Sequence, residues 1–245
     1  MKKVIASLLT LACVWAAPAA AQSFTADAFF TPYDDLLQTH VDHGNVSYNG
    51  WAQDPRHMGA MTMLANADVT TLGDKADTMA FWMNAYNLLT IDLIVREQEK
   101  ESIKNLGGLF TSPWKKHTWM IGNEEVTLDH IEHGILRKMD EPLIHIAINC
   151  ASRSCPPLYD RAYKGSILQN QLSAQAKRFV RDSQNGVKYN PDGSVDVSMI
   201  FKWFADDFGG KEGVSTFIAK HKQTDTPPEI NGYLPYDWSL NGTWE

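Results

Sequence analysis

One helix constrains this fold more than any other segment. Residues 79–95 read MAFWMNAYNLLTIDLIV, and Asp74 or Asp77 just before them can cap a helix over roughly 75–97. At 100° per residue, the apolar side chains of this helix point to every side, which is typical of a helix that protein surrounds completely. We therefore expect it to lie at the centre of the fold, with the remaining elements packed around it.

Shorter helices and hairpins are expected around this central helix. The patterns predict a first helix over residues 29–41, whose start Pro32 can delay. Further helices are expected in 54–67, 129–139 and 165–182, from Ser198, and near 212–221. Hairpins are expected around Gly122-Asn123 and Asn190–Gly193, and a buried strand in PLIHIAIN. These elements follow no β-α-β rhythm, so we expect the α+β class and a single globular domain. The Pro- and aromatic-rich C-terminal tail is expected to pack onto that domain, because disordered tails lack aromatic residues.

The N-terminus has the features of a secretory signal peptide. Two lysines precede the apolar run VIASLLTLACVWAA, and the small residues Ala19–Ala21 suit a cleavage site near Ala21/Gln22. We therefore expect residues 1–21 to be removed and the protein to be secreted or periplasmic. No second run is long and apolar enough to span a bilayer.

Charge and cysteine content narrow the classes of partner. The full chain has 22 Lys+Arg and 29 Asp+Glu, and the signal segment contains two of the lysines and no acid, so the mature chain has a net charge of −9. An acidic surface without a basic cluster argues against nucleic acid and anionic lipid as partners, and no cofactor motif is present. Cys150 and Cys155 remain, in a compartment that favours oxidation.

Two amides interrupt the central apolar helix. Asn84 and Asn87 project about 60° apart, among apolar neighbours. Each must find partners, because an unpaired buried amide costs about 1–3 kcal/mol. They can hydrogen-bond the backbone of a neighbouring loop, which is the more common arrangement, or they can orient a catalytic side chain or donate to an oxyanion.

A carboxylate lies on the apolar side of the predicted helix over 129–139. Glu132 falls inside the apolar arc, whereas His130, His133 and Arg137 cluster on the other side. A core-facing carboxylate is rare unless paired, so Glu132 has a buried cation or backbone N–H groups as partners, or it is an orienter or general acid/base with a raised pKa. The histidine pair lacks a third ligand at a recognisable spacing, so no metal site is expected.

The segment HIAINCASRSCPPL, residues 145–158, holds both cysteines. Strand alternation places His145 beside Ala147 and Asn149, where a lone histidine is more often a core residue than a catalyst. Cys150 ends the predicted strand and a serine-rich loop follows, which suits a nucleophile for acyl transfer. Alternatively, Cys150 and Cys155 close a small disulfide loop, and spacing alone favours this. The two alternatives conflict, because a sulfur in a disulfide is not a resting nucleophile.

Three segments resemble a known family. FWMNAYNLLTI, VTLDHIEHGILR and HIAINCASRSCPPL, in this order, resemble domain-of-unknown-function family 547 (DUF547), and SMIFKWFADDF and LPYDWSLN resemble its bacterial secreted members. The family has no settled activity, so the resemblance indicates which residues form its motifs but not which reaction they carry out. Its motif residues here are Phe81, Trp82, Asn84, Tyr86, Asn87, Glu132, His133, Arg137, Cys150, Ser152, Cys155 and Pro156.

The same resemblance suggests a division of the chain. Residues 22–69 would form an N-terminal helical segment packed on the core, 70–180 the family core domain, and 181–245 a hairpin, helices and tail of the same globule.

Three hypotheses about function follow from these residues. In the first, a cysteine-dependent hydrolase or acyl transferase uses Cys150 as nucleophile, His133 as base and Glu132 or Asn84 as orienter, and acts on a small molecule or peptide. In the second, a non-catalytic periplasmic binding or scaffold domain has a Cys150–Cys155 disulfide and a buried polar network. The third, thiol redox or soft-metal handling, ranks last because the spacing is not CxxC.

Overall fold

The central helix occupies the predicted residues. The computed structural model describes residues 26–245, so the predicted signal peptide and its cleavage site lie outside the described part. Helix α4 (Lys75–Glu97) begins after Asp74, whose side chain accepts hydrogen bonds from the backbone N–H groups of Ala76 and Asp77. All its residues from Met79 to Ile94 are buried. The prediction of a central, fully surrounded helix is confirmed.

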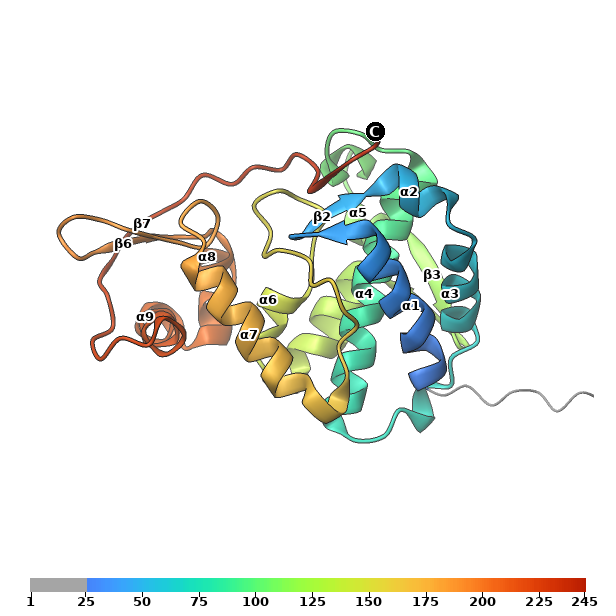
Figure 1. The fold of residues 1–245 in the computed structure, drawn as a ribbon, viewed down its shortest axis with the longest axis horizontal. Helices are drawn as coiled ribbons and strands as arrows, with labels where there is room; N and C mark the ends of the chain where they lie inside the picture. Colours follow the sequence, from blue (N-terminus) through green and yellow to red (C-terminus); the bar gives the residue numbers. More distant parts are fainter. Residues whose placement is uncertain (1–25) are drawn as a thin grey trace, which may run out of the picture.

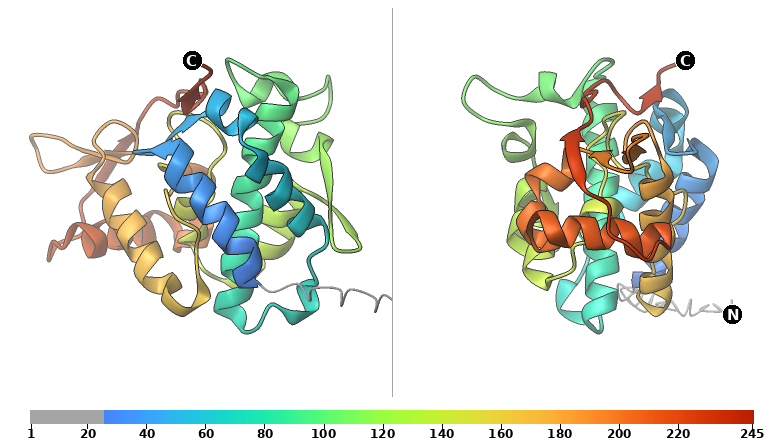
Figure 2. Two further views of the ribbon diagram at one scale, coloured as in Figure 1. Left: turned by 45° about the vertical axis from the view of Figure 1, so that its right-hand side comes forward. Right: turned by 90° about the vertical axis from the view of Figure 1, so that its left-hand side faces the viewer.

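The other helices surround α4. Figure 1 shows α1, α2 and α3 on one side of it and α7, α8 and α9 on the other, and both views in Figure 2 place α4 between α1 and the segment that leads into α6. The α-helices are α1 (Ala26–His40), α2 (Tyr48–Gln53), α3 (Pro55–Ala65), α5 (Pro113–Lys116), α6 (Ile144–Ala147), α7 (Leu168–Arg181), α8 (Ile200–Trp203) and α9 (Gly210–Lys222). Short 3-10 helices are η1 (Val69–Thr71), η2 (Ile103–Leu106), η4 (Leu136–Met139), η5 (Gly165–Ile167) and η6 (Ala205–Phe208), and η3 (His130–Ile135) is a π-helix.

Short strands form three small sheets within the described residues. Strands β3 (Thr118–Ile121) and β4 (Glu124–Thr127) pair as an antiparallel hairpin, with Gly122 in its turn at a φ of +60° as the sequence predicts. The other sheets have the orders β1-β2-β8 and β5-β6-β7, each with one antiparallel and one parallel pair. Their strands are β1 (Val41–Asp42), β2 (Asn45–Ser47), β5 (Val187–Tyr189), β6 (Val195–Val197), β7 (Ile230–Tyr233) and β8 (Gly242–Thr243). The fold is therefore α+β, as predicted.

Four local predictions need correction. PLIHIAIN does not form a strand: Ile144–Ala147 form the single turn α6, and Ile148 after it is extended. The predicted helix over 129–139 is helical but divides into the π-helix η3 and the 3-10 helix η4. The helix predicted from Ser198 also divides, into α8 and η6. Pro32 lies inside α1 and does not delay its start.

The C-terminal tail packs on the body, as predicted. Figure 1 shows it crossing from β7 at one end of the molecule to the region of α2 and α5 at the other. Leu240 is buried, and the Trp244 indole N–H donates to the carbonyl of Glu99 over 2.6 Å. Within the described residues, no helix combines the length and the apolar composition needed to cross a bilayer.

Candidate functional site

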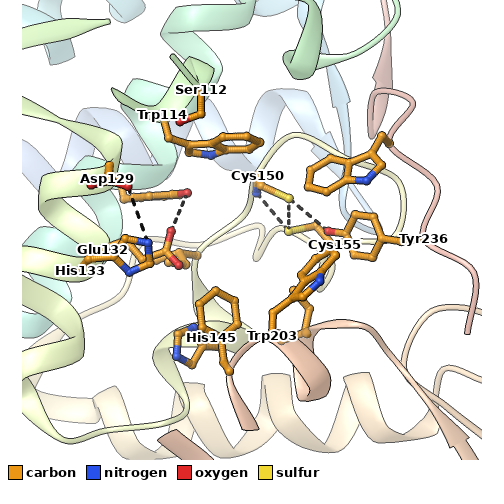
Figure 3. A pocket seen from close by; sticks show the side chains of 15 residues that line it. Ser112, Trp114, Asp129, Glu132, His133, His145, Cys150, Cys155, Trp203 and Tyr236 are labelled. Atoms are coloured by element: carbon orange, nitrogen blue, oxygen red, sulfur yellow. Dashed lines mark hydrogen bonds and ion pairs between the residues drawn. The ribbon is translucent and has the colours of Figure 1, made fainter. Parts of the chain in front are cut away.

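One pocket contains three of the four predicted catalytic residues, Glu132, His133 and Cys150, together with Tyr86 and Cys155. It has a volume of about 210 Å³ and lies where η3, the cysteine loop and the C-terminal tail meet. Its walls consist of Tyr86, Ser112, Trp114, Asp129, Glu132, His133, His145, Ile148, Cys150, Cys155, Ile200, Trp203, Phe204, Tyr236 and Trp238. In Figure 3, Glu132 and His133 stand on one wall and Cys150 and Cys155 on the opposite one.

Cys150 has several hydrogen-bonding partners. Its sulfur lies 3.0 Å from Ser152 Oγ, 3.2 Å from the Tyr236 hydroxyl and 2.8 Å from Cys155 Sγ. Burial would raise the pKa of this thiol, but hydrogen bonds from Cys155, Ser152 and Tyr236 outweigh burial and lower the pKa to about 7. Burial and the neighbouring Cys150 raise the pKa of Cys155 instead. Cys150 is therefore the sulfur that ionises near neutral pH.

The predicted disulfide is absent. Both cysteines are free thiols, and their sulfurs, 2.8 Å apart, are in hydrogen-bonding contact without a covalent bond. The backbone N–H of Cys150 also donates to Cys155 Sγ over 3.1 Å. The two sulfurs are close together, as the disulfide hypothesis required. They remain two thiols whose pKa values are shifted in opposite directions.

Helix α4 positions the cysteine loop through Asn87. The Asn87 amide donates to the carbonyl of Ala147 over 3.0 Å and accepts from the Asn149 N–H over 2.8 Å. Asn149 in turn accepts from the N–H of Ala151, a residue at a φ of +57°, and donates to the carbonyl of Pro156. These bonds fix both ends of the loop that presents Cys150.

The C-terminal tail fixes the other side of this loop. The N–H of Arg153 donates to the Ser239 carbonyl over 2.8 Å, and the N–H of Ser154 donates to the Asp237 carbonyl over 3.2 Å. This pairing brings the Tyr236 hydroxyl within 2.9 Å of Ser152 Oγ, beside the Cys150 sulfur. The environment of Cys150 therefore combines two segments more than 80 residues apart in the sequence.

Glu132 faces the pocket as a mostly buried carboxyl group. The Tyr86 hydroxyl donates to Glu132 Oε2 over 3.2 Å, and no Lys or Arg within the described residues forms an ion pair with it. Burial, and next the negative charge of Cys150, raise the pKa of Glu132 to about 7, although the bond from Tyr86 opposes this. The hydrogen-bond partner of Glu132 is thus a tyrosine hydroxyl, and not the buried cation or backbone N–H group that a structural role would give it. The raised pKa of Glu132 is the property that a role as general acid/base requires.

His133 does not contact the thiol. Its Nε2 lies 3.7 Å from Asp129 Oδ1, and its Nδ1 lies 3.4 Å from a guanidinium nitrogen of Arg137. No hydrogen bond joins it to Cys150, whose partners are named above. Burial lowers the pKa of His133 and keeps the imidazole neutral at neutral pH.

A second histidine lines the pocket, and the sequence did not single it out as a candidate. His145 Nε2 lies 2.7 Å from Asp207 Oδ2, and the imidazole stacks on Phe204 with 3.8 Å between ring centroids. Asp207 also accepts two 2.6 Å hydrogen bonds from Arg137. Burial lowers the pKa of His145 to about 4, although Asp207 opposes this. Arg137 and His145 thus share one carboxylate behind the pocket wall.

Five predicted site residues do not line the pocket: Asn84, Asn87, Trp82, Arg137 and Ser152. The Asn84 amide donates to the carbonyl of Tyr163 over 2.8 Å and accepts from its N–H over 2.9 Å, which is the structural alternative for this residue. Trp82 is buried and packs edge-on against Phe81. No cluster of three or more His, Cys, Asp or Glu among the described residues has a geometry that suits a metal ion, and His130 with His133 is no exception.

An aromatic wall surrounds Cys150. Trp203, Tyr236 and Trp238 form a mutual cluster with ring centroids 4.6–5.7 Å apart, and Trp114 packs edge-on against Trp238 at 5.9 Å. Figure 3 shows Trp114, Trp203 and Tyr236 grouped around the sulfur. None of these four was singled out as a site residue. The motifs SMIFKWFADDF and LPYDWSLN, which contain three of them, were the available signal.

Comparison with known proteins identifies the central part of the chain. Residues 70–180 match the model of the family described as protein of unknown function, DUF547. No curated protein and no solved structure matches the chain. The matched segment includes Tyr86, Glu132 and Cys150, whereas Trp203, Tyr236 and Trp238 follow it. Residues 70–180, which include both polar walls of the pocket, are thus the part of the chain that is similar to the DUF547 family.

Proposed function

We propose that the pocket is a thiol active site that hydrolyses or transfers acyl groups, with Cys150 as the nucleophile. The observation that carries the proposal is the set of donors around its sulfur, from Ser152, Tyr236 and Cys155. They hold the thiol pKa at about 7, so that a large fraction is thiolate at neutral pH without a partner base.

Glu132 supplies the acid/base function in this proposal. The thiolate attacks the acyl carbonyl carbon, forms a thioester and expels the leaving group, which takes a proton from neutral Glu132. The resulting carboxylate then accepts a proton from water or from a second acceptor molecule as that nucleophile attacks the thioester, and the thiolate leaves. A pKa of about 7 suits a group that must donate a proton in one step and accept one in the next.

The roles differ from those expected from the sequence. His133 has no contact through which to deprotonate Cys150, and Asn84 is engaged with Tyr163. Tyr86 takes the orienting role toward Glu132, because its hydroxyl holds one carboxyl oxygen. Export through residues 1–21 is part of the proposal, and N-terminal sequencing of the mature protein from the periplasmic or secreted fraction tests it, with Gln22 expected as the first residue.

Thiol counting and activity assays test the proposed function. The native, unreduced mature protein should contain two reactive thiols, and limited labelling with iodoacetamide should modify Cys150 first. A panel of activated esters, thioesters and peptides should then include a substrate whose turnover the Cys150→Ser substitution abolishes. Cys155→Ser is the matched control, since a serine hydroxyl can still donate to the Cys150 thiolate and much of the activity should remain. Undiminished turnover in Cys150→Ser, or a stable Cys150–Cys155 bond in the native protein, would refute the proposal.

A further inference from the structure

The pocket contains negative charge and no cationic side chain of Lys or Arg. Among its fifteen lining residues are the carboxyl groups of Asp129 and Glu132 and the ionisable Cys150, but no lysine or arginine. A substrate that carries a carboxylate or phosphate would enter this pocket against like charges, which act strongly in a partly buried site.

Near the pocket, no Lys or Arg of the described residues pairs with Glu132. Lys115 Nζ lies 3.7 Å from Asp129, the Arg137 guanidinium forms two bonds with Asp207, and Lys104 Nζ lies 5.1 Å from the centroid of the Trp238 ring. Glu132 therefore lacks an ion-pair partner among the described residues. A mostly buried carboxylate without a cation is unusual, and it faces the space that a ligand would fill.

The aromatic wall lies across the pocket from this carboxyl group. The rings of Trp114, Trp203 and Tyr236 are grouped around Cys150. Trp238 lines the same pocket and packs against all three rings, and Trp203 remains 43% exposed. Tryptophan faces attract organic cations, by about 0.5–2 kcal/mol per contact, and attract quaternary ammonium groups most characteristically as a cage of several rings. Lys104 on Trp238 already makes one such contact from outside the pocket.

We propose that the pocket selects an acyl substrate that carries an organic cation, such as an ammonium group, held between the aromatic rings and Glu132. This inference deepens the proposed function, and it rests on that function for the role of Cys150 as nucleophile. The cation pairs with Glu132 when this carboxyl group is ionised, as it is after its proton has passed to the leaving group, and the rings replace the hydration shell of the cation. Anionic substrates of the same shape are excluded.

Charge-paired thiol reagents test this selectivity without any turnover. The probes are methanethiosulfonates with a trimethylammonium or a sulfonate group; the Cys150 thiolate attacks the reagent sulfur, forms a mixed disulfide and releases methanesulfinate. Rates are measured on reduced protein at about pH 8, where most Cys150 is thiolate, and each is divided by the rate with a small free thiol. The normalised rate should be on the order of tenfold higher for the cationic reagent. A ratio near one, a reversed ratio, or failure of both reagents to reach Cys150 would overturn the inference.

Variants locate the source of the preference. Glu132→Gln should lower the ratio several-fold, whereas Glu124→Gln, which removes an equal charge from the exposed hairpin, should leave it unchanged. Trp203→Ala should slow the cationic reagent and Trp203→Phe should largely restore it, because a ring face is retained. If the two glutamate variants lower the ratio equally, the net charge of the protein is responsible and the inference is wrong.

A competition experiment separates charge from shape. Choline should protect Cys150 from neutral iodoacetamide at millimolar concentration, whereas its neutral analogue with a quaternary carbon in place of nitrogen should protect several-fold less at equal ionic strength. Equal protection by both compounds would contradict the inference. The result is independent of the proposed function: cation preference without Cys150-dependent turnover would refute only the catalytic proposal, and turnover without cation preference would refute only this one.

Discussion

At the scale of single residues, the charge of Cys150 affects the protonation of Glu132. The two groups lie on opposite walls of one pocket, and the negative charge of the thiolate is the second largest cause of the raised pKa of Glu132. The Glu132 carboxyl group and the Cys150 thiol both titrate near neutral pH, so their protonation equilibria are coupled. Removing either group should change the titration of the other, so single substitutions at this site are informative about both.

The hydroxyl groups beside Cys150 should determine its reactivity. Ser152→Ala or Tyr236→Phe removes a donor to the thiolate, and each should raise the apparent pKa of Cys150 by about one to two units, since a hydrogen bond to a charged group contributes about 1.5–3 kcal/mol. The pH dependence of iodoacetamide labelling, followed by mass spectrometry, measures this pKa. Ser112→Ala is the matched control, because it removes a pocket hydroxyl that does not contact the sulfur. Unchanged profiles in both donor variants would contradict the assigned cause.

Glu132 should reduce the stability of the protein as pH rises. Its pKa is about 7 in the folded protein, against an ordinary value of 4.5, so the folded state holds a proton that the unfolded state loses between these values. The wild-type free energy of unfolding should therefore fall relative to Glu132→Gln from about pH 4.5 to about pH 7, by up to about 3 kcal/mol. Urea unfolding across this range measures the difference. The exposed Glu124→Gln should show no such trend, and a constant difference for Glu132→Gln would contradict the raised pKa.

The burial of Glu132 was predictable from the sequence, but the aromatic wall was not. A helical wheel places Glu132 among apolar neighbours even though the segment turned out to be a π-helix, because both helical forms keep this side chain on the inner side. Tyr236 and Trp238 lie in a proline-rich tail without periodicity, so no local pattern indicates which part of the protein they contact.

At the scale of elements, α4 holds two loops through amides one turn apart. Asn84 fixes the backbone of Tyr163, and Asn87 fixes the backbone on both sides of Ile148. Both amides are buried and fully engaged, so either substitution leaves backbone groups unpaired. Only the second loop leads to Cys150, and the two asparagines therefore provide a matched pair.

Substitution of these asparagines should separate stability from site geometry. Asn84→Ala and Asn87→Ala should each lower the free energy of unfolding by about 2–4 kcal/mol, because two buried backbone partners lose a hydrogen bond. Only Asn87→Ala should also change the pKa and labelling rate of Cys150, measured on the folded protein at low temperature. An equal effect of both variants on labelling would show that general loosening, rather than positioning of the cysteine loop, is responsible.

The elements also show where sequence patterns succeed and fail. The limits of α4 were predictable, because Asp74 is a clear N-cap and the apolar run is long. PLIHIAIN reads as a strand by the alternation of its isoleucines, but a short buried run of this kind does not distinguish a strand from a helical turn. None of the described strands pairs with this segment and all residues of α6 are buried, so the backbone satisfies its hydrogen bonds within one helical turn.

At the scale of the whole molecule, the pocket depends on contacts between distant parts of the chain. The N-terminal strand β2 pairs with β8 near the C-terminus, and the tail between β7 and β8 pairs with the cysteine loop. The family segment, residues 70–180, supplies Cys150 and Glu132, and the last part of the chain supplies the donor Tyr236. These long-range pairings determine the geometry of the pocket, and local residue propensity or hydrophobic periodicity in the sequence does not predict them.

Asn241 joins these three parts and provides the most global test. Its side chain accepts a 2.6 Å hydrogen bond from the Tyr48 hydroxyl and donates to Asn149 over 3.1 Å and to Gly44 over 3.3 Å, all at buried positions. Asn241→Ala should lower the free energy of unfolding by about 3–5 kcal/mol, because several buried groups lose their partner together. Hydrogen exchange should also accelerate in residues 150–155 and in the tail as one unit, since the loop and the tail hold each other through backbone bonds. Asn45→Ala, at the exposed first residue of β2, is the control and should change neither quantity measurably. Faster exchange confined to the tail, with the cysteine loop still protected, would mean that the loop is held by α4 alone and that the C-terminal segment is not needed to form the pocket.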